Sequence, residues 1–240
     1  VLLGGDAELS FTYRFATAEE RAWMRGEADR IAEVADFRSM LVVETGEGTE
    51  RGLTQVKSVD DAYPLYGSVE LDPPMPLAQA LDGAGGLPGA VIAPALADRL
   101  GIAPGATVRL GTQDFHLSAL LTREPDDAGD GFGLGPRTIV RTEALADSQL
   151  LEPGTLFETR YRLSLPDDAD LAALEAEATA RFRDTGLRWR DARNGAPGVA
   201  EFVDRLGAFL VLVGLAGLAV GGVGVSAAVR AYLDGKTGVI

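Results

Sequence analysis

The longest apolar pattern in the chain lies near its C-terminal end. Residues 206–229, LGAFLVLVGLAGLAVGGVGVSAAV, contain no charged side chain, whereas Asp204, Arg205 and Arg230 flank them. A helix of this length rises about 36 Å, which is enough to cross a hydrocarbon core of roughly 30 Å with a modest tilt. We therefore predict one transmembrane helix within a longer helical segment at 197–233.

Glycines recur in this run at spacings of three and four residues. The row Gly214, Gly217, Gly221 and Gly224 keeps to one face of an α-helix, in the small-xxx-small pattern that lets membrane helices approach closely. The stretch 222–227 also spells G-x-G-x-x-A, the fingerprint of a dinucleotide-binding turn. That fingerprint needs a short strand before it, and the apolar run is too long for one. We predict helix packing and keep a soluble dinucleotide-binding enzyme as a remote alternative.

The rest of the chain mixes strand-like and helix-like patterns. Alternation of apolar and polar residues predicts short strands, and a turn at 46–51 joins two of them as a hairpin. The strands are predicted at 7–15, 36–45, 52–59, 89–93, 156–165 and 187–193, with two more within 102–121 and one within 138–150.

Three helices are predicted between these strands, together with a further short helix within 138–150. Thr17 and Glu20 form a capping box that begins a helix at about 18–33. The stretch 94–101 has proline in the first turn and glycine at the end, and 168–183 is amphipathic. The sequence therefore predicts many short elements of both kinds.

The middle of this region differs from its flanks in composition. Residues 64–150 are richer in Gly, Pro and short strands, which predicts a β-rich inserted subdomain. The flanks, 1–63 and 151–196, would form a membrane-proximal α/β part. The predicted fold class is thus α+β, an extracytoplasmic mixed α/β domain with a β-rich insertion, followed by one transmembrane helix.

Charge is distributed unevenly along the chain. The net charge is −14, from 36 acidic and 22 basic side chains, and nearly all of these groups precede residue 206. Because nucleic acids are bound by clustered Lys and Arg, this balance excludes a nucleic-acid partner. Arg230 and Lys236 follow the apolar run, so the positive-inside rule places 234–240 at the start of a cytoplasmic segment. Residues 1–205 would then be periplasmic, on a bacterial inner membrane.

The residues that could carry chemistry are few. The chain has no cysteine and one histidine, His116, which argues against metal sites of Cys or His and against a Ser-His-Asp triad. Asp126, Asp127 and Asp130 crowd a Gly-rich loop, where carboxylates could bind Ca²⁺, but their spacing is not that of an EF-hand. We interpret this loop as a mobile acidic surface loop and leave metal binding open. We predict no catalytic residue and no cofactor in this chain.

Aromatic residues are interpreted as core rather than as ligand platforms. Trp23, Trp189 and Tyr161 are the positions concerned, and each lies within a predicted helix or strand. The chain begins at Val1 rather than Met, so we also interpret it as a segment of a longer protein.

Several longer stretches resemble one known family. They are LGGDAEL at 3–9, TAEERAWM at 17–24, VKSVDDAYPLYG at 56–67, PGATVRLG at 104–111, GFGLGPR at 131–137, RYRL at 160–163 and the whole of 190–240. In these stretches the chain resembles the FtsX/MacB-like permeases of ABC transporters, most closely the YbbP-like branch.

The resemblance implies a non-catalytic, multi-pass permease subunit. A second permease copy and a separate ABC ATP-binding subunit, which carries ATP and Mg²⁺, would be its partners. Arg230, Tyr232 and Lys236 would mark the cytoplasmic coupling segment. The resemblance further implies mechanotransmission, in which ATP hydrolysis changes the shape of the outer domains, in export or extraction of hydrophobic or lipid-like molecules. The alternative is a membrane-tethered regulator of a periplasmic enzyme, which would then be a partner together with membrane lipid.

Overall fold

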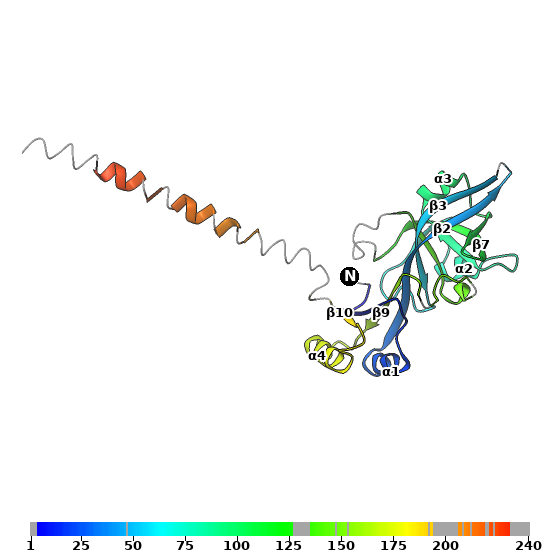
Figure 1. Cartoon of the computed structure of the whole chain (residues 1–240), viewed down its shortest axis with the longest axis horizontal. Helices are drawn as coiled ribbons and strands as arrows, with labels where there is room; N and C mark the ends of the chain where they lie inside the picture. Colours follow the sequence, from blue (N-terminus) through cyan, green and yellow to red (C-terminus); the bar gives the residue numbers. More distant parts are fainter. Residues whose placement is uncertain are drawn as a thin grey trace, which may run out of the picture. The chain divides into compact units, whose positions relative to one another are not determined.

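The structure is a computed structural model, shown in Figure 1. It describes residues 4–46, 48–126, 135–146, 148–152, 154–191 and 193, and then 206–207, 209–211, 213–218, 221–222 and 224–230. The chain divides into two compact units, Val1–Gly195 and Ala196–Ile240. Each unit is described by itself below.

Ten strands, counted over the described residues, form one mixed sheet at the centre of the first unit (Figure 1). The order is β10-β1-β9-β2-β3-β8-β5-β7-β4, and β6 joins the sheet through β2 and β7. The strands are β1 (Ala7–Thr12), β2 (Arg30–Thr45), β3 (Gly48–Val59), β4 (Glu70–Asp72), β5 (Gly89–Ile92), β6 (Thr107–Leu110), β7 (Gln113–Arg123), β8 (Arg137–Arg141), β9 (Phe157–Ser164) and β10 (Arg188–Asp191).

Short helices pack on this sheet and bury three apolar clusters. The helices are α1 (Ala18–Glu27), α2 (Leu77–Asp82), α3 (Pro94–Leu100), the 3-10 turn η2 (Glu143–Leu145) and α4 (Leu171–Arg181). Helices α1 and α4 cover β1 and β9, where Trp23 meets Phe182 edge-on at 5.9 Å between ring centroids. Helices α3 and α2 cover two further clusters on β2–β8. A mixed α/β domain, as predicted, is therefore confirmed.

The predicted hairpin and capping box are both present. Strands β2 and β3 pair without interruption from Val34–Val59 to Thr45–Gly48. The Thr17 side chain accepts a hydrogen bond from the amide of Glu20, and the Glu20 carboxylate accepts one from the amide of Thr17.

The first helix is shorter than predicted. It ends at Glu27, whereas the sequence pattern extended it to residue 33. Strand β2 begins at Arg30 instead, because residues 30–37 pair with β9 in an antiparallel ladder. Ala32 and Val34 alternate with less buried neighbours there, which is the period of a strand.

Most of the remaining elements agree with the patterns that predicted them, whereas β4 and α2 have no predicted counterpart. Helix α3 has Pro94 in its first turn, and Gly101 ends it in the left-handed conformation, with φ +63°. The strands predicted at 89–93, within 102–121, within 138–150, at 156–165 and at 187–193 are present as β5 to β10.

Most strands of segment 64–150 occupy one side of the sheet, whereas β6 pairs with β2 on the edge that also carries β9. The others follow β3 in the order β8-β5-β7-β4, whereas β10, β1 and β9 lie on the other side of β2. The long strand β2 serves both sides, since it pairs with β9 over 30–37 and with β6 at Leu41 and Val42. The boundaries of the predicted insertion stay a prediction, and the sheet runs continuously across both of them.

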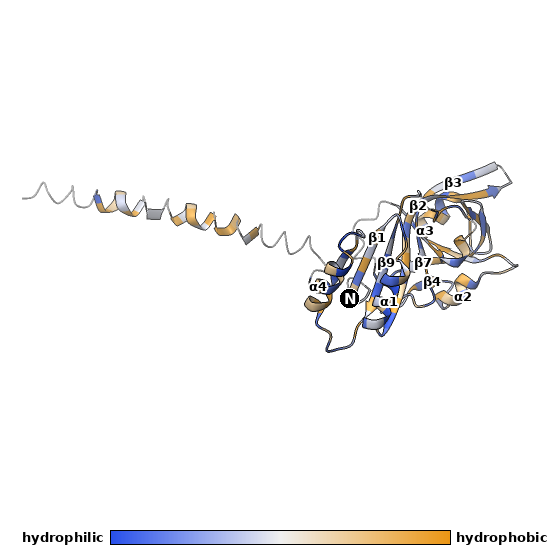
Figure 2. Cartoon of the chain, turned by 60° about the horizontal axis from the view of Figure 1, so that its bottom comes forward, coloured by the Kyte–Doolittle hydropathy of each residue, from blue (hydrophilic) through white to orange (hydrophobic). Residues whose placement is uncertain are grey.

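The described pieces of the second unit are helical, and Figure 2 shows that they are largely hydrophobic. Gly214, Gly217, Gly221, Gly224 and Arg230 all lie in these pieces. Within the described residues, no helix has both the length and the apolar character needed to cross a membrane. The span 206–229 is described only in part, and the transmembrane helix and the packing role of its glycines stay predictions. Tyr232 and Lys236 lie outside the described residues.

Candidate functional site

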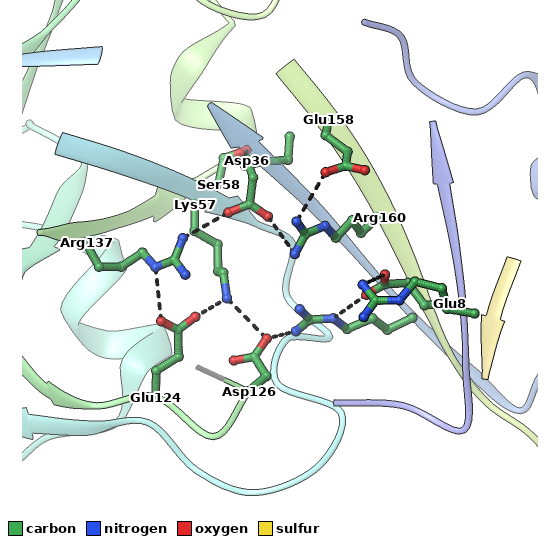
Figure 3. A network of polar contacts seen from close by, with 12 residues as sticks. Glu8, Asp36, Lys57, Ser58, Glu124, Asp126, Arg137, Glu158 and Arg160 are labelled. Carbon is green, nitrogen blue, oxygen red and sulfur yellow. Dashed lines mark hydrogen bonds and ion pairs between the residues drawn. The ribbon is translucent and has the colours of Figure 1, made fainter. Parts of the chain in front are cut away.

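Charged side chains gather on one face of the sheet, opposite the face that α1 and α4 cover. Strand alternation places them there: Asp36 of β2 lies opposite Lys57 of β3 and Glu158 of β9 in the ladders. Glu8 of β1 is paired in the same way with Arg162 of β9. Figure 3 shows Lys57 pointing toward Glu124 and Asp126. We call the following eight residues the buried ion network: Glu8, Asp36, Lys57, Glu124, Asp126, Arg137, Arg160 and Arg162.

Lys57 lies at the centre of the buried ion network. Its side chain is 0% exposed, and its Nζ donates to Glu124 Oε1 and, at 3.1 Å, to Asp126 Oδ2. The Tyr63 hydroxyl lies against the same two carboxylates, 3.0 Å from Glu124 Oε1 and 2.8 Å from Asp126 Oδ1. One ammonium group and one phenol thus hold two buried carboxylates together.

Arg162 extends the network toward the edge of the sheet. It is among the largest fully buried side chains, and its Nη1 donates to Asp126 Oδ2. Its Nε lies 3.5 Å from Glu8 Oε2, and Arg190 of β10 approaches the other oxygen of Glu8 at 3.6 Å. These contacts connect Asp126 to three strands at one edge, β9, β1 and β10.

Arg137 extends the network in the other direction. Its Nη1 donates to Asp36 Oδ1 at 3.1 Å, and its Nε lies 3.2 Å from Glu124 Oε2. Arg160 follows, with Nη1 3.7 Å from Asp36 Oδ2 and Nη2 donating to Glu158 at 3.2 Å. The contacts therefore form a continuous path from Glu8 to Glu158.

The charges within the buried ion network balance. Four carboxylates face four cationic side chains, so no formal charge is left over among its members. Removing one ion from water costs several kcal/mol, and this cost is offset only while each ion keeps its partners. Burial, reinforced by the charge of Glu124, raises the pKa of Tyr63 far above its usual range, so the phenol stays a neutral donor. The buried ion network is therefore a joint made of charges that lie opposite one another.

The joint connects the two parts that the sequence separates. Glu124, Asp126 and Arg137 come from segment 64–150, whereas their partners Lys57 and Arg162 come from the flanks. Paired buried ions have directional requirements that apolar contacts lack, so they fix one relative placement of the two strand sets.

Asp126 corrects one prediction. The sequence placed it in an acidic surface loop, but its side chain is 1% exposed and contacts Lys57, Arg162 and Tyr63. Asp127 and Asp130 lie outside the described residues. Within the part of the chain that the structure describes, no group of three or more His, Cys, Asp or Glu side chains could hold a metal ion.

The other singled-out side chains lie where the sequence suggested. His116 is on β7, in a half-buried position. Trp23 and Tyr161 are buried in the cluster under α1 and α4, and Trp189 packs against that cluster. Their interpretation as core residues is confirmed.

Sequence reasoning missed the buried ion network, although a signal was present. The stretches that carry the family resemblance supply most of its members: Glu8, Lys57, Arg137, Arg160 and Arg162. In RYRL the arginines alternate with apolar residues inside a strand, a pattern that by itself predicts one buried and one solvent-facing side, so the signal is the overlap with these stretches and not the alternation.

Comparisons with known proteins agree with the resemblance. The chain is 27% identical over 143 residues to an uncharacterised ABC transporter permease, YbbP, of Escherichia coli strain K12. The match covers 59% of this chain and 17% of that protein, so the chain spans less than a fifth of the length of this curated relative. No protein-family model matches the chain.

The comparison with solved structures finds a periplasmic region and an extracellular domain. The periplasmic region of MacB from Actinobacillus actinomycetemcomitans matches with a TM-score of 0.51 at 10% identity, over 82% of this chain and 94% of that one. The extracellular domain of the noncanonic ABC-type transporter YknZ from Gram-positive bacteria matches at 13% identity with a TM-score of 0.49, over 77% and 100%. The predicted resemblance to FtsX/MacB-like permeases, with YbbP as the sequence relative, is confirmed, and the MacB match shows the fold.

Proposed function

We propose that this chain, whose relative is an ABC transporter permease, is the outer domain and following membrane helix of such a permease. The observation that carries the proposal is the pairing of the first and last strands of the domain. Strands β1 and β10 are antiparallel neighbours, with Ala7 opposite Asp191. Both connections of the domain therefore leave from one edge of the sheet, as a domain inserted between two membrane helices requires.

The same edge leads directly into the buried ion network. Glu8 on β1 contacts both Arg190 on β10 and Arg162 on β9, and Arg162 continues to Asp126. A displacement of the membrane helices would thus be passed to segment 64–150 through rigid contacts. This supports a mechanotransmission role, in which ATP hydrolysis on a separate subunit moves the outer domain.

The partners and location follow from this role. We propose a permease dimer in a bacterial inner membrane, with residues 1–205 periplasmic and an ABC ATP-binding subunit that carries ATP and Mg²⁺. Arg230, Tyr232 and Lys236 would form the coupling segment toward that subunit. The transported molecules would be hydrophobic or lipid-like.

The role is tested by measuring distances between spin labels in the full permease with its ATP-binding subunit, in nanodiscs. Leu53→Cys and Ala172→Cys, both at exposed positions, carry the labels, and any cysteines elsewhere in the full permease and its ATP-binding subunit are first replaced by serine. We expect the distance between labels within one domain to stay constant and the distance between the two copies to change with ATP. Outer domains that keep the same separation with and without ATP would contradict the proposal.

The glycine row is tested in the same complex. Gly217→Leu or Gly221→Leu should disrupt helix packing and assembly, because a bulky side chain blocks close approach of two helices. Ala216→Leu adds the same bulk on another face and serves as the control. If both glycine variants assemble and turn over normally, the packing role is wrong.

A further inference from the structure

Two clefts in the described part of the chain differ in their charge. The larger has a volume of about 530 Å³, and its charged lining balances three arginines against three acids. Two of those acids are already engaged, since Glu33 pairs with Arg21 at 2.9 Å and Asp60 accepts the backbone amides of Glu33 and Ala62. This lining has no excess of either sign.

The second cleft lies at the open end of the buried ion network and has a volume of about 400 Å³. Its lining includes Arg38, Arg160 and Arg188 but only two acids, Asp36 and Glu158. The volume is within the range of small-molecule sites. Its walls therefore carry an excess of positive charge, although the whole chain has a net charge of −14.

Both acids of this cleft are shared between cations. Asp36 accepts from Arg137 and also faces Arg160, as the network geometry shows. Glu158 accepts from Arg160 at 3.2 Å and from Arg188 at 2.6 Å. Arg38 is exposed and stands opposite Gln55 in the β2–β3 ladder. Cationic groups in a concave, partly apolar wall concentrate the field and attract anions.

The rim of the same cleft is apolar and exposed. Leu156 is 73% exposed and Tyr13 is 54% exposed, and both line the cleft. Tyr13 has φ +63°, a left-handed conformation that costs a non-glycine residue about 1 kcal/mol or more. Its amide donates to the carbonyl of Phe157 at 2.7 Å, which holds the backbone of Tyr13 beside the start of β9, where Leu156 precedes Phe157. Exposed apolar side chains next to a cationic wall favour a ligand with both characters.

We propose that this cleft binds an amphiphilic anion. A carboxylate or phosphate group would face Arg38 and Arg188, and an apolar chain would lie across Tyr13 and Leu156. The site rests on the cleft alone, whereas its role in transport rests on the proposed function, which it deepens by giving the transported molecule an anionic group.

The test is calorimetric titration of the full chain in nanodiscs of neutral lipid, with empty nanodiscs as the blank. The probes are octyl phosphate, inorganic phosphate and octanol. We expect one saturable site for octyl phosphate, and at least tenfold weaker binding of the other two, because each lacks one half of the ligand. No saturable octyl phosphate binding would overturn the proposal.

Substitutions at exposed positions test which residues bind octyl phosphate. Arg38→Gln should weaken octyl phosphate binding about tenfold and Leu156→Ser about fivefold, at unchanged thermal unfolding temperatures. The matched controls are Arg25→Gln, in the larger cleft, and Leu53→Ser, an exposed leucine of β3, and both should bind as the unaltered chain does. Loss of binding with Arg25→Gln but not with Arg38→Gln would overturn the assignment. This binding experiment does not need ATP hydrolysis. A failure to bind octyl phosphate would therefore contradict the ligand proposal without contradicting the permease proposal.

Discussion

The two faces of β9 are stabilised in different ways. Tyr161 and Leu163 point into the apolar cluster beneath α1 and α4, whereas Arg160 and Arg162 point into the buried ion network. Apolar packing is non-directional and proportional to the area buried. Ion pairs out of water stabilise only when each charge meets its partners at a defined position. One strand thus has an apolar face that tolerates changes in side-chain size and an ionic face that does not tolerate the loss of a charged partner.

This difference affects how the domain loses folding stability when side chains are substituted. An apolar face loses stability gradually as side chains shrink, because neighbours partly fill the space. A buried ion network loses stability abruptly when one member is removed, since the remaining charges stay buried without a partner. Substitutions on the two faces should therefore differ in the loss of unfolding free energy that they cause.

Removing the central cation should have the largest effect. Lys57→Met leaves Glu124 and Asp126 facing each other without their ammonium partner, and we expect a loss of about 3–5 kcal/mol in unfolding free energy. Urea unfolding of the chain measures it. Arg123→Gln, which breaks an exposed pair with Glu70, is the control and should cost less than about 1 kcal/mol. Equal effects of the two substitutions would contradict the importance of the network.

The same substitution on each face compares them directly. Tyr63→Phe removes a donor from two buried carboxylates, and we expect a loss of about 2 kcal/mol because hydrogen bonds to charged groups are the stronger class. Tyr161→Phe removes an acceptor from the amide of Ala16, 2.9 Å away, and from the partly exposed Arg21 at 3.3 Å, and should cost about 1 kcal/mol. Both are read from the same urea experiment. A larger loss for Tyr161→Phe would reverse the comparison.

Acid should remove the stabilising contribution of Glu20, which lies at the start of α1 on the apolar face. Burial alone would raise the pKa of Glu20, but hydrogen bonds from Arg14 and from the Thr17 amide lower it from 4.5 to about 2. Because the folded-state pKa is depressed, Glu20 stabilises the fold above pH 4.5, and this contribution is lost as the pH falls toward 2. We expect about 1–2 kcal/mol, since Arg14 is partly exposed to solvent.

The measurement is the difference in unfolding free energy between the unaltered chain and Glu20→Gln, from pH 6 to pH 2.5. The difference should shrink as the pH falls. A difference that stays constant over this range would show that the charge of Glu20 is not the stabilising feature.

The sequence predicted local elements better than contacts between distant strands. The capping box at Thr17 and Glu20 and the glycine end of α3 depend on neighbouring residues, so their patterns were readable. The first helix was overextended because pairing of β2 with β9, more than 100 residues away, decides where β2 begins.

The buried ion network could not be predicted for the same reason. Asp126 stands beside glycines and other acids in the sequence, which is typical of a surface loop. Its burial depends on Lys57 and Arg162, whose positions follow from the registers of β3 and β9. The alternating arginines of RYRL are typical of a half-buried strand with a solvent-facing side, so they gave no indication of the residues that cover them.

The central claim is that the buried ion network joins the flanking strands and segment 64–150 into one rigid unit. Native-state hydrogen exchange on the chain, in increasing denaturant, tests it by comparing amides of β1 and β9 with amides of β5 and β8. The claim predicts that both groups open with the same free energy, within about 0.5 kcal/mol, and that Lys57→Met lowers both together. Opening of β5 and β8 at a free energy clearly below that of β1 and β9 in the unaltered chain would contradict it.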